Sequence, residues 1–134
     1  MLLNLLLNMK ENLVDKLPDI SDKPKGETEW VKAADFEVFN FTQKQYQNIN
    51  WLGNVKEYRL SLDNLMTWQE GVDPQKVKYF INNQDKIKNI YVVNYDGNNI
   101  IVDGNHRATA ARILGWKKIS VKYVDYEEAK INEL

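Results

Sequence analysis

The sequence contains no cysteine, which excludes disulfide bonds, thiolate metal sites and cysteine nucleophiles. It contains only one histidine, His106, and zinc sites usually need several histidine or cysteine ligands. A zinc centre is therefore not expected. The absence of cysteine agrees with a reducing compartment, and we expect a cytoplasmic protein.

The chain also lacks an excess of positive charge and a long apolar run. Its 18 Lys and Arg against 19 Asp and Glu give a net charge of −1, so the fold as a whole is not a polycation that binds nucleic acid nonspecifically. Asn4, Asn8 and Lys10 interrupt the leucine-rich start well before the ~20 apolar residues that a membrane-spanning helix needs. We predict neither a membrane span nor a signal peptide.

What the sequence does contain is enough apolar surface for one ordinary domain, with 43% hydrophobic residues in 134. We divide it into an N-terminal helical extension, residues 1–54, and a domain of residues 55–134. Apolar residues at helical spacing from Leu2 to Leu17 predict an amphipathic helix that ends at Pro18. This helix either packs on its own domain or contacts another chain, for example as a homodimer.

The rest of the extension, from Trp30 to Asn54, is aromatic-rich and is predicted to form two short helices. Thr42 can cap the second of them, because Gln45 stands three residues later in the capping-box position. No catalytic spacing is recognisable here, so we expect this segment to cover the following domain.

Residues 55–134 carry clear signals for strands, helices and turns. Alternation, capping residues and turn dipeptides define each element. The predicted elements are a strand at Tyr58 to Leu62, a helix starting at Asp73-Pro74, a hairpin of Ile90 to Tyr95 and Ile100 to Val102 around Asp96-Gly97-Asn98-Asn99, a helix from about His106 to Leu114 ended by Gly115, a strand at Ile119 to Tyr123 and a short acidic helix after Asp125.

The segment from Val102 to Arg107 is the candidate functional loop. A strand ends and a helix begins within a few residues, so the first helical amides lack partners and the helix dipole places positive charge there. Gly104 permits a tight turn and a close approach to the backbone, and Arg107 has a guanidinium that suits phosphate oxygens. This combination predicts an anion site, most plausibly for a nucleotide phosphate.

Asp103 is the exception, because a carboxylate repels an anion. It can cap the helix, hold a magnesium ion, or accept a proton from an attacking hydroxyl. His106 can equally order the loop or take part in catalysis, and Arg107 can pair with Asp103 or Glu70. The residues alone leave these alternatives open.

The run Ile101-Val102-Asp103-Gly104-Asn105-His106-Arg107-Ala108, followed by Ala110 to Gly115 and Ile119-Ser120-Val121, resembles the ParB/sulfiredoxin superfamily. The resemblance extends from about Lys56 to Asp125, roughly half the chain. It implies an α+β fold: a small mixed sheet with packed helices, here preceded by the N-terminal helical extension.

The branches of this superfamily differ in their loops. Sulfiredoxins carry a catalytic cysteine where this chain has Asn105, so their chemistry is excluded. ParB proteins bind CTP through a Gly-Glu-Arg-Arg-x-Arg-Ala motif; Gly104, Arg107 and Ala110 match it, whereas Asn105, His106 and Thr109 depart from it. Only nine residues follow Asp125, so no ParB-type helix-turn-helix domain is expected there.

The loop is most similar to that of the free serine kinase branch. That resemblance implies phosphoryl transfer to a small hydroxyl substrate, with Asp103, Glu70 and His106 as catalytic residues. Gly104, Asn105, His106, Arg107 and Thr109 would bind the nucleotide (ATP, ADP or CTP), and Asp103 would hold Mg²⁺.

Two functions follow as competing hypotheses. The first is a nucleotide-phosphate-binding domain that acts as a phosphotransferase or nucleotide hydrolase. The alternative is a non-catalytic module of phage or plasmid type that binds DNA or a host protein. For the DNA case, Lys117, Lys118 and Lys122 near Arg112 are the candidate phosphate contacts, although such lysines are often simply a solvated surface.

Overall fold

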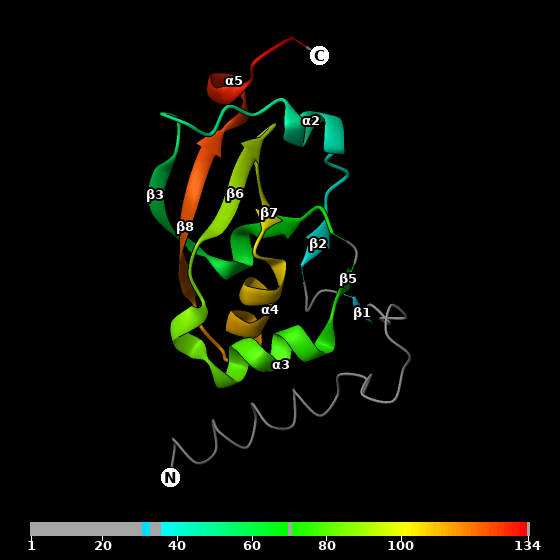
Figure 1. Ribbon diagram of the computed structural model, residues 1–134, viewed down its shortest axis with the longest axis vertical. Helices are drawn as coiled ribbons and strands as arrows, with labels where there is room; N and C mark the ends of the chain where they lie inside the picture. The colour runs from blue at the N-terminus through cyan, green and yellow to red at the C-terminus, as the bar shows by residue number, and fades with distance from the viewer. Residues whose placement is uncertain (1–30, 33–35, 70, 134) are drawn as a thin grey trace.

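The computed structural model describes residues 31–32, 36–69 and 71–133, and Figure 1 shows them arranged around one twisted sheet. The predicted helix from Leu2 to Leu17 and the candidate residue Glu70 lie outside the described residues. In chain order the elements are β1 (Val31–Lys32), β2 (Glu37–Val38), α2 (Gln43–Gln47), β3 (Lys56–Ser61), η1 (Leu62–Asn64), β4 (Leu65–Thr67), β5 (Gly71–Val72), α3 (Pro74–Asn82), η2 (Gln84–Lys86), β6 (Ile90–Tyr95), β7 (Asn98–Asp103), α4 (Asn105–Ile113), β8 (Lys118–Asp125) and α5 (Tyr126–Ala129).

Six strands form the main sheet in the order β2-β4-β7-β6-β8-β3, while β1 and β5 pair separately. The pairs β2–β4, β4–β7 and β6–β8 are parallel, and the pairs β6–β7 and β8–β3 are antiparallel. A mixed sheet with packed helices confirms the predicted α+β class. β3 is an edge strand, so one of its sides has no neighbouring strand in this sheet.

The hairpin between β6 and β7 turns at Asp96 and Gly97. Both residues have positive φ, 52° and 79°, as a two-residue turn with the twist of the flanking strands requires. Asn98 and Asn99, which we assigned to the turn, already belong to β7. The predicted hairpin is confirmed, with a shorter turn.

The predicted start of α3 is also confirmed. The side chain of Asp73 accepts a hydrogen bond from the Gln75 amide at 2.9 Å, and Pro74 occupies the first turn of the helix. At the end of α4, Gly115 has φ +81° and its amide donates to the Arg112 carbonyl at 3.0 Å, which closes the helix as expected.

The prediction of two short helices between Trp30 and Asn54 is wrong in part. The described residues of this segment contain two strands, β1 and β2, and a single helix, α2. The capping box is present, because Thr42 Oγ1 accepts from the Gln45 amide at 3.1 Å. The two strands have two residues each, too few to show an alternating pattern, and they pair with β5 and β4, which come much later in the chain.

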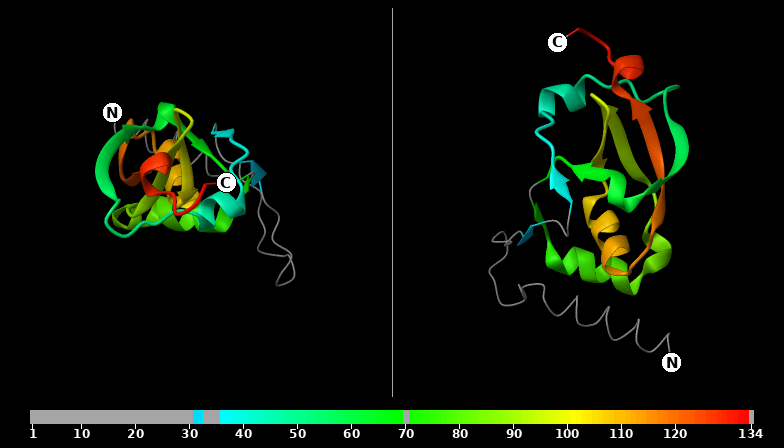
Figure 2. Two further views of the ribbon diagram at one scale, coloured as in Figure 1. Left: turned by 90° about the horizontal axis from the view of Figure 1, so that it is seen from above. Right: turned by 180° about the vertical axis from the view of Figure 1, so that it is seen from behind.

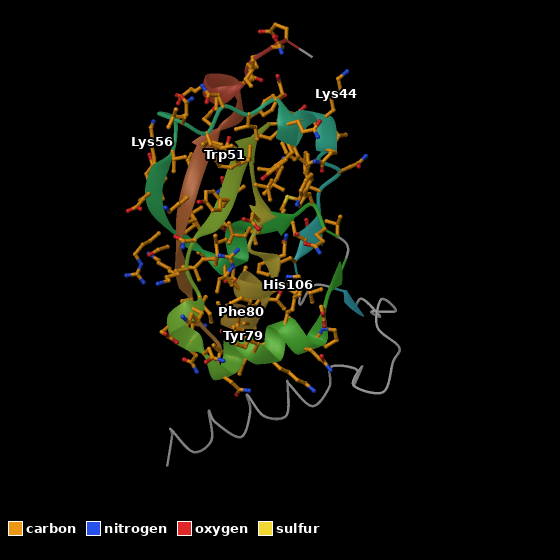
Figure 3. The ribbon with its side chains drawn as sticks, in the orientation of Figure 1. Lys44, Trp51, Lys56, Tyr79, Phe80 and His106 are labelled. Atoms are coloured by element: carbon orange, nitrogen blue, oxygen red, sulfur yellow. The ribbon has the colours of Figure 1, made fainter. Side chains whose placement is uncertain are left out.

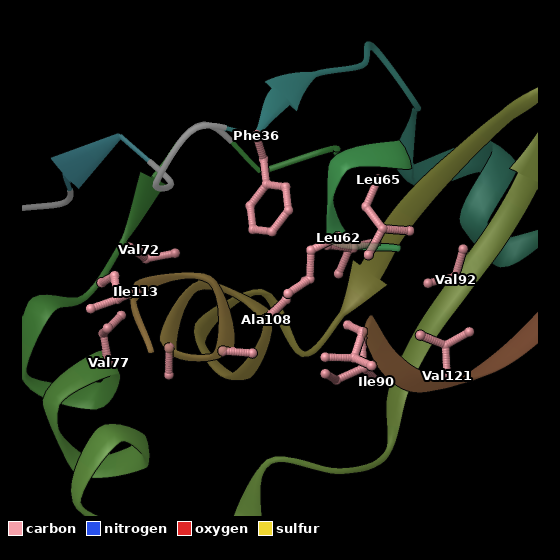
Figure 4. Packing of buried hydrophobic residues seen from close by; sticks show 14 residues of the cluster. Phe36, Leu62, Leu65, Val72, Val77, Ile90, Val92, Ala108, Ile113 and Val121 are labelled. Atoms are coloured by element: carbon pink, nitrogen blue, oxygen red, sulfur yellow. The ribbon is translucent and has the colours of Figure 1, made fainter. Parts of the chain in front are cut away.

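Alternate residues of the central strands supply a core on each face of the sheet. Val92 and Ile101 belong to the core beneath α3 and α4, part of which Figure 4 shows with Phe36 above α4. Val93 and Ile100 belong to the second core, which is rich in aromatic rings and closed by the α2 segment and α5. Figure 2 shows α3 and α4 at the end of the molecule opposite α5. No helix in the described ranges has the length and apolarity needed to cross a bilayer.

Candidate functional site

The turn from β7 to α4 opens onto a groove between α3 and α4, with a volume of about 480 Å³. Figure 3 shows His106 near the start of α4, with Phe80 and Tyr79 below it along α3. We call this space the α3–α4 groove. Its lining residues are Lys76, Tyr79, Phe80, Lys86, Asp103, Gly104, His106 and Arg107.

Gly104 makes the turn in a single residue. It is the N-cap of α4 and has φ +95°, a conformation that L side chains rarely adopt. A Cβ at this position would lie 3.1 Å from Cγ1 and 3.2 Å from Cα of Ile90. The backbone conformation and the packing against β6 therefore both require glycine here.

Asp103 does not cap the helix, contrary to one of the alternatives that the sequence left open. It is the last residue of β7, its side chain is 58% exposed, and a carboxylate oxygen lies 3.6 Å from the Arg107 guanidinium. Gly104 occupies the N-cap position and has no side chain, so it makes no side-chain capping hydrogen bond to α4. The helix dipole therefore adds positive charge to this end of the groove.

Arg107 is turned largely toward the protein. Its Nη1 donates to the carbonyl oxygens of Lys88 and Asn89 at 2.7 and 2.9 Å, and its Nη2 faces Asp103. The side chain is 21% exposed and still lines the groove. Nη1 of Arg107 thus fixes the loop before β6, while the same guanidinium also lines the groove.

His106 joins the start of α4 to the start of α3. Its Nε2 accepts a hydrogen bond from the Asp73 amide at 3.0 Å, which places the proton of the neutral ring on Nδ1. Burial lowers the pKa of His106 below its ordinary value, and the nearby charge of Lys76 lowers it further. The imidazole is therefore neutral near pH 7, and its Nε2 is already engaged as an acceptor.

The side chains of Asn105 and Thr109, two residues of the predicted nucleotide-binding set, do not line the groove. Asn105 is 2% exposed; its Oδ1 accepts from the Thr67 hydroxyl and its Nδ2 donates to Gln69 Oε1 at 3.0 Å. Thr109 is fully buried, and its hydroxyl has no hydrogen-bond partner among the described atoms. Both side chains belong to the interior of the domain.

Sequence reasoning missed the two lysines of the groove, Lys76 on α3 and Lys86 on η2. Together with Arg107 they bring three cationic side chains from three elements to one space that also contains the carboxylate of Asp103. Neither lysine stands in a recognisable motif. Only the packing of α3 against α4 brings them to the loop, so no local pattern could have identified them.

The structure places Asp103, Gly104, His106 and Arg107 in the lining of the same groove. In the part of the chain that the structure describes, no group of three or more His, Asp or Glu side chains is close enough to hold a metal ion. Glu70, the second predicted catalytic carboxylate, is not among the described residues.

No protein-family model matches the chain, and no curated protein matches it. Among solved structures the chain is similar to the crystal structure of sulfiredoxin from Arabidopsis thaliana, with 25% identity and a TM-score of 0.46. That likeness covers 55% of this chain and 91% of the sulfiredoxin chain, and it carries neither a function nor a site to this protein.

Proposed function

We propose that this protein binds the phosphate groups of a nucleotide in the α3–α4 groove. The observation that supports the proposal is the convergence of Lys76, Lys86 and Arg107 on one groove at the uncapped start of α4. Among the described residues that line the groove, three carry a positive charge and one, Asp103, carries a carboxylate, whereas the whole chain has a net charge of −1. Cationic side chains at the N-terminus of a helix are a common arrangement for holding phosphate oxygens.

The opposite wall of the groove suits a nucleotide base. Tyr79 is 51% exposed, and its ring lies 5.2 Å from that of Phe80 in an edge-to-face contact. An exposed aromatic ring beside a phosphate site provides a flat apolar surface on which a base can rest. The groove volume of about 480 Å³ lies within the range of small-ligand sites, roughly 300 to 1,000 Å³.

Phosphoryl transfer is the second step of the proposal. Asp103 lines the groove with an exposed carboxylate beside Arg107. In this proposal Asp103 accepts the proton of the attacking hydroxyl or water. The attacking oxygen bonds to the terminal phosphorus as the bond from that phosphorus to the bridging oxygen breaks, and the shortened nucleotide leaves. The cations hold the phosphates, and Mg²⁺, when bound, would neutralise part of their charge. His106 positions the start of α4 through its bond to Asp73 and does not act as a base through Nε2.

Binding is tested by thermal unfolding and calorimetry with ATP, ADP and CTP, each with and without Mg²⁺. A nucleotide that binds the native state raises the midpoint temperature of unfolding, and this shift grows with the logarithm of the nucleotide concentration. The double variant Lys76→Ala/Lys86→Ala should lose this shift. The matched control is Lys44→Ala/Lys56→Ala, which removes two lysines that Figure 3 shows toward the other end of the molecule. This control variant should retain the nucleotide-induced shift of the unfolding temperature. An unchanged shift in the groove variant would refute the proposal.

Turnover is tested separately by measuring phosphate release with the nucleotide that binds. Asp103→Asn should keep the binding signal and lose release by a factor of about 10² to 10⁴, the usual contribution of a general base. Release at the wild-type rate would show that Asp103 is not catalytic, while leaving the binding site itself supported.

A further inference from the structure

A second concentration of positive charge lies away from the groove, where β3 pairs with β8. Two adjacent hollows are present, of about 350 and 490 Å³, and both include Arg59 and Ser120 in their walls. We call their combined area the β3–β8 surface. Its cationic side chains are Arg59, Lys88, Lys117, Lys118 and Lys122.

Strand pairing explains why these cations meet. In the antiparallel pair β3–β8, Arg59 lies opposite Ser120, and Ser61 opposite Lys118. Side chains alternate between the faces of a strand, so Arg59, Lys118 and Lys122 share one face. The intervening residues Ile119 and Val121 point to the other face and are buried in the core. β8 can therefore anchor its apolar side and leave its basic side open.

Lys88 reaches the same surface from the loop before β6. That loop is fixed by the hydrogen bonds of Arg107 to the carbonyls of Lys88 and Asn89. By contrast Arg112, which we had grouped with these lysines from sequence, is bound elsewhere: Nη1 donates to the Leu62 carbonyl at 2.9 Å, and Nη2 lies 3.4 Å from Asp63. The structure thus replaces Arg112 by Arg59 and Lys88.

The positive charge of this surface is only partly offset within the described part of the molecule, by Glu57, which lies directly opposite Lys122 in the β3–β8 pair. No ion pair there involves any of the five cations. Glu57 is the acidic residue in the walls of the two hollows. Lys122 lies over the ring of Tyr91, with Nζ 6.0 Å from its centroid, which keeps the ammonium group on the surface. A polyanion would gain attraction to several cations without displacing internal salt bridges.

Two aromatic side chains line the hollows. Tyr58 lies opposite Val121 in the strand pair, so it projects to the face of β3 away from Arg59, at the open edge of the sheet. It is 45% exposed, contacts Tyr123 edge-on at 5.0 Å and lines the first hollow. Trp116 lines the second hollow. Basic side chains that follow a phosphate backbone, interleaved with rings on which bases stack, are the features of single-strand binding surfaces.

We propose that the β3–β8 surface binds single-stranded nucleic acid, with phosphates on the five cations and bases against Tyr58 and Trp116. A single strand is favoured over a duplex because the surface is hollowed and formed by strands and a loop, with no projecting helix or ribbon to enter a major groove. Lys118 and Lys122 are four residues apart in one strand, about 13 Å, so they would contact different phosphates. This surface shares no lining residue with the α3–α4 groove, although the loop at Lys88 and Asn89 adjoins both.

The test measures fluorescence anisotropy of labelled 12-nucleotide oligo(dT) and oligo(rU) with the full chain over a salt series. Five phosphate contacts predict a slope of log K against log salt of about −3.5, since each contact contributes about −0.7 on single strands. Lys118→Ala/Lys122→Ala should reduce the slope to about −2 and weaken binding more than tenfold at low salt. Lys44→Ala/Lys56→Ala, with the same loss of charge, should bind as wild type.

Stacking is tested by Tyr58→Leu, which keeps an apolar side chain at an exposed position and should weaken binding about tenfold without changing the slope. Equal affinities for the Lys118/Lys122 variant and its control would overturn the proposal. So would tighter binding of a 12-base-pair duplex than of the single strands, or equal binding of polyglutamate or of anionic phospholipid vesicles, because these would indicate another partner.

Discussion

The guanidinium of Arg107 holds the carbonyl oxygen of Asn89 at 2.9 Å. Asn89 has φ +56°, an uncommon conformation for a residue other than glycine. The bond therefore connects the start of α4 with a bent loop that leads into β6. It also gives Arg107 a structural role in addition to its place in the α3–α4 groove, and the two roles can be separated by experiment.

Replacing Arg107 by Lys should destabilise the fold by about 1.5 to 3 kcal/mol, the usual range for hydrogen bonds to charged groups. A single ammonium cannot reproduce the planar fork that contacts two carbonyls and Asp103. Chemical denaturation measures the change. Arg59→Lys serves as the control, because the Arg59 side chain makes no hydrogen bond or ion pair among the described residues. The stability of this variant should stay within about 0.5 kcal/mol of wild type. Equal stability of both variants would contradict the structural role.

Gly104→Ala should cost more stability than Gly97→Ala. Both glycines have positive φ, +95° and +79°, so both variants strain the backbone by about 1 kcal/mol or more. Only at Gly104 would the new Cβ also meet Ile90, at 3.1 and 3.2 Å, whereas nothing lies within 4 Å at Gly97. Urea denaturation of the two variants isolates the packing cost. If both lose the same free energy of unfolding, the close approach to β6 costs nothing.

Asn105 and Thr67 should be energetically coupled. Asn105→Ala leaves the buried Thr67 hydroxyl without its acceptor, which should cost about 1 to 3 kcal/mol. In a cycle with Thr67→Val the double variant should lose less than the sum of the single variants, by about 0.5 to 3 kcal/mol. The pair Asn94 and Asn99, joined at 2.9 Å in a partly buried position, is the control and should couple more weakly. Strict additivity at Asn105 and Thr67 would exclude the coupling.

His106 should make stability depend on pH in a defined direction. Burial, followed by the charge of Lys76, lowers its pKa in the folded state, so between that pKa and about 6.5 the unfolded chain binds more protons. The free energy of unfolding should therefore be highest above pH 6.5, fall as the pH drops, and level off below the folded pKa. Because the chain has one histidine, His106→Gln should flatten this part of the profile in equilibrium unfolding measured from pH 5 to 8. An unchanged profile would show that another group titrates.

Local patterns were sufficient where neighbouring residues decide the structure. Asp73 and Pro74 start a helix because one supplies a cap and the other a preset φ, and both act within a single turn. The hairpin at Asp96-Gly97 and the helix end at Gly115 follow from positive φ angles that few residues accept. The mixture of predicted strands and helices after residue 55 agrees with the α+β class, which the family resemblance implied.

Tertiary structure alone decided which side chains line the α3–α4 groove. The loop after Val102 is fully visible in the sequence, yet only packing shows that Asn105 and Thr109 are buried and that Arg107 bonds to the loop before β6. Pairing between strands far apart in the chain, such as β3 with β8, places Arg59 beside Ser120. Periodicity tells which face of a strand is apolar, but it does not tell which strand lies alongside, because that choice is made by the whole core.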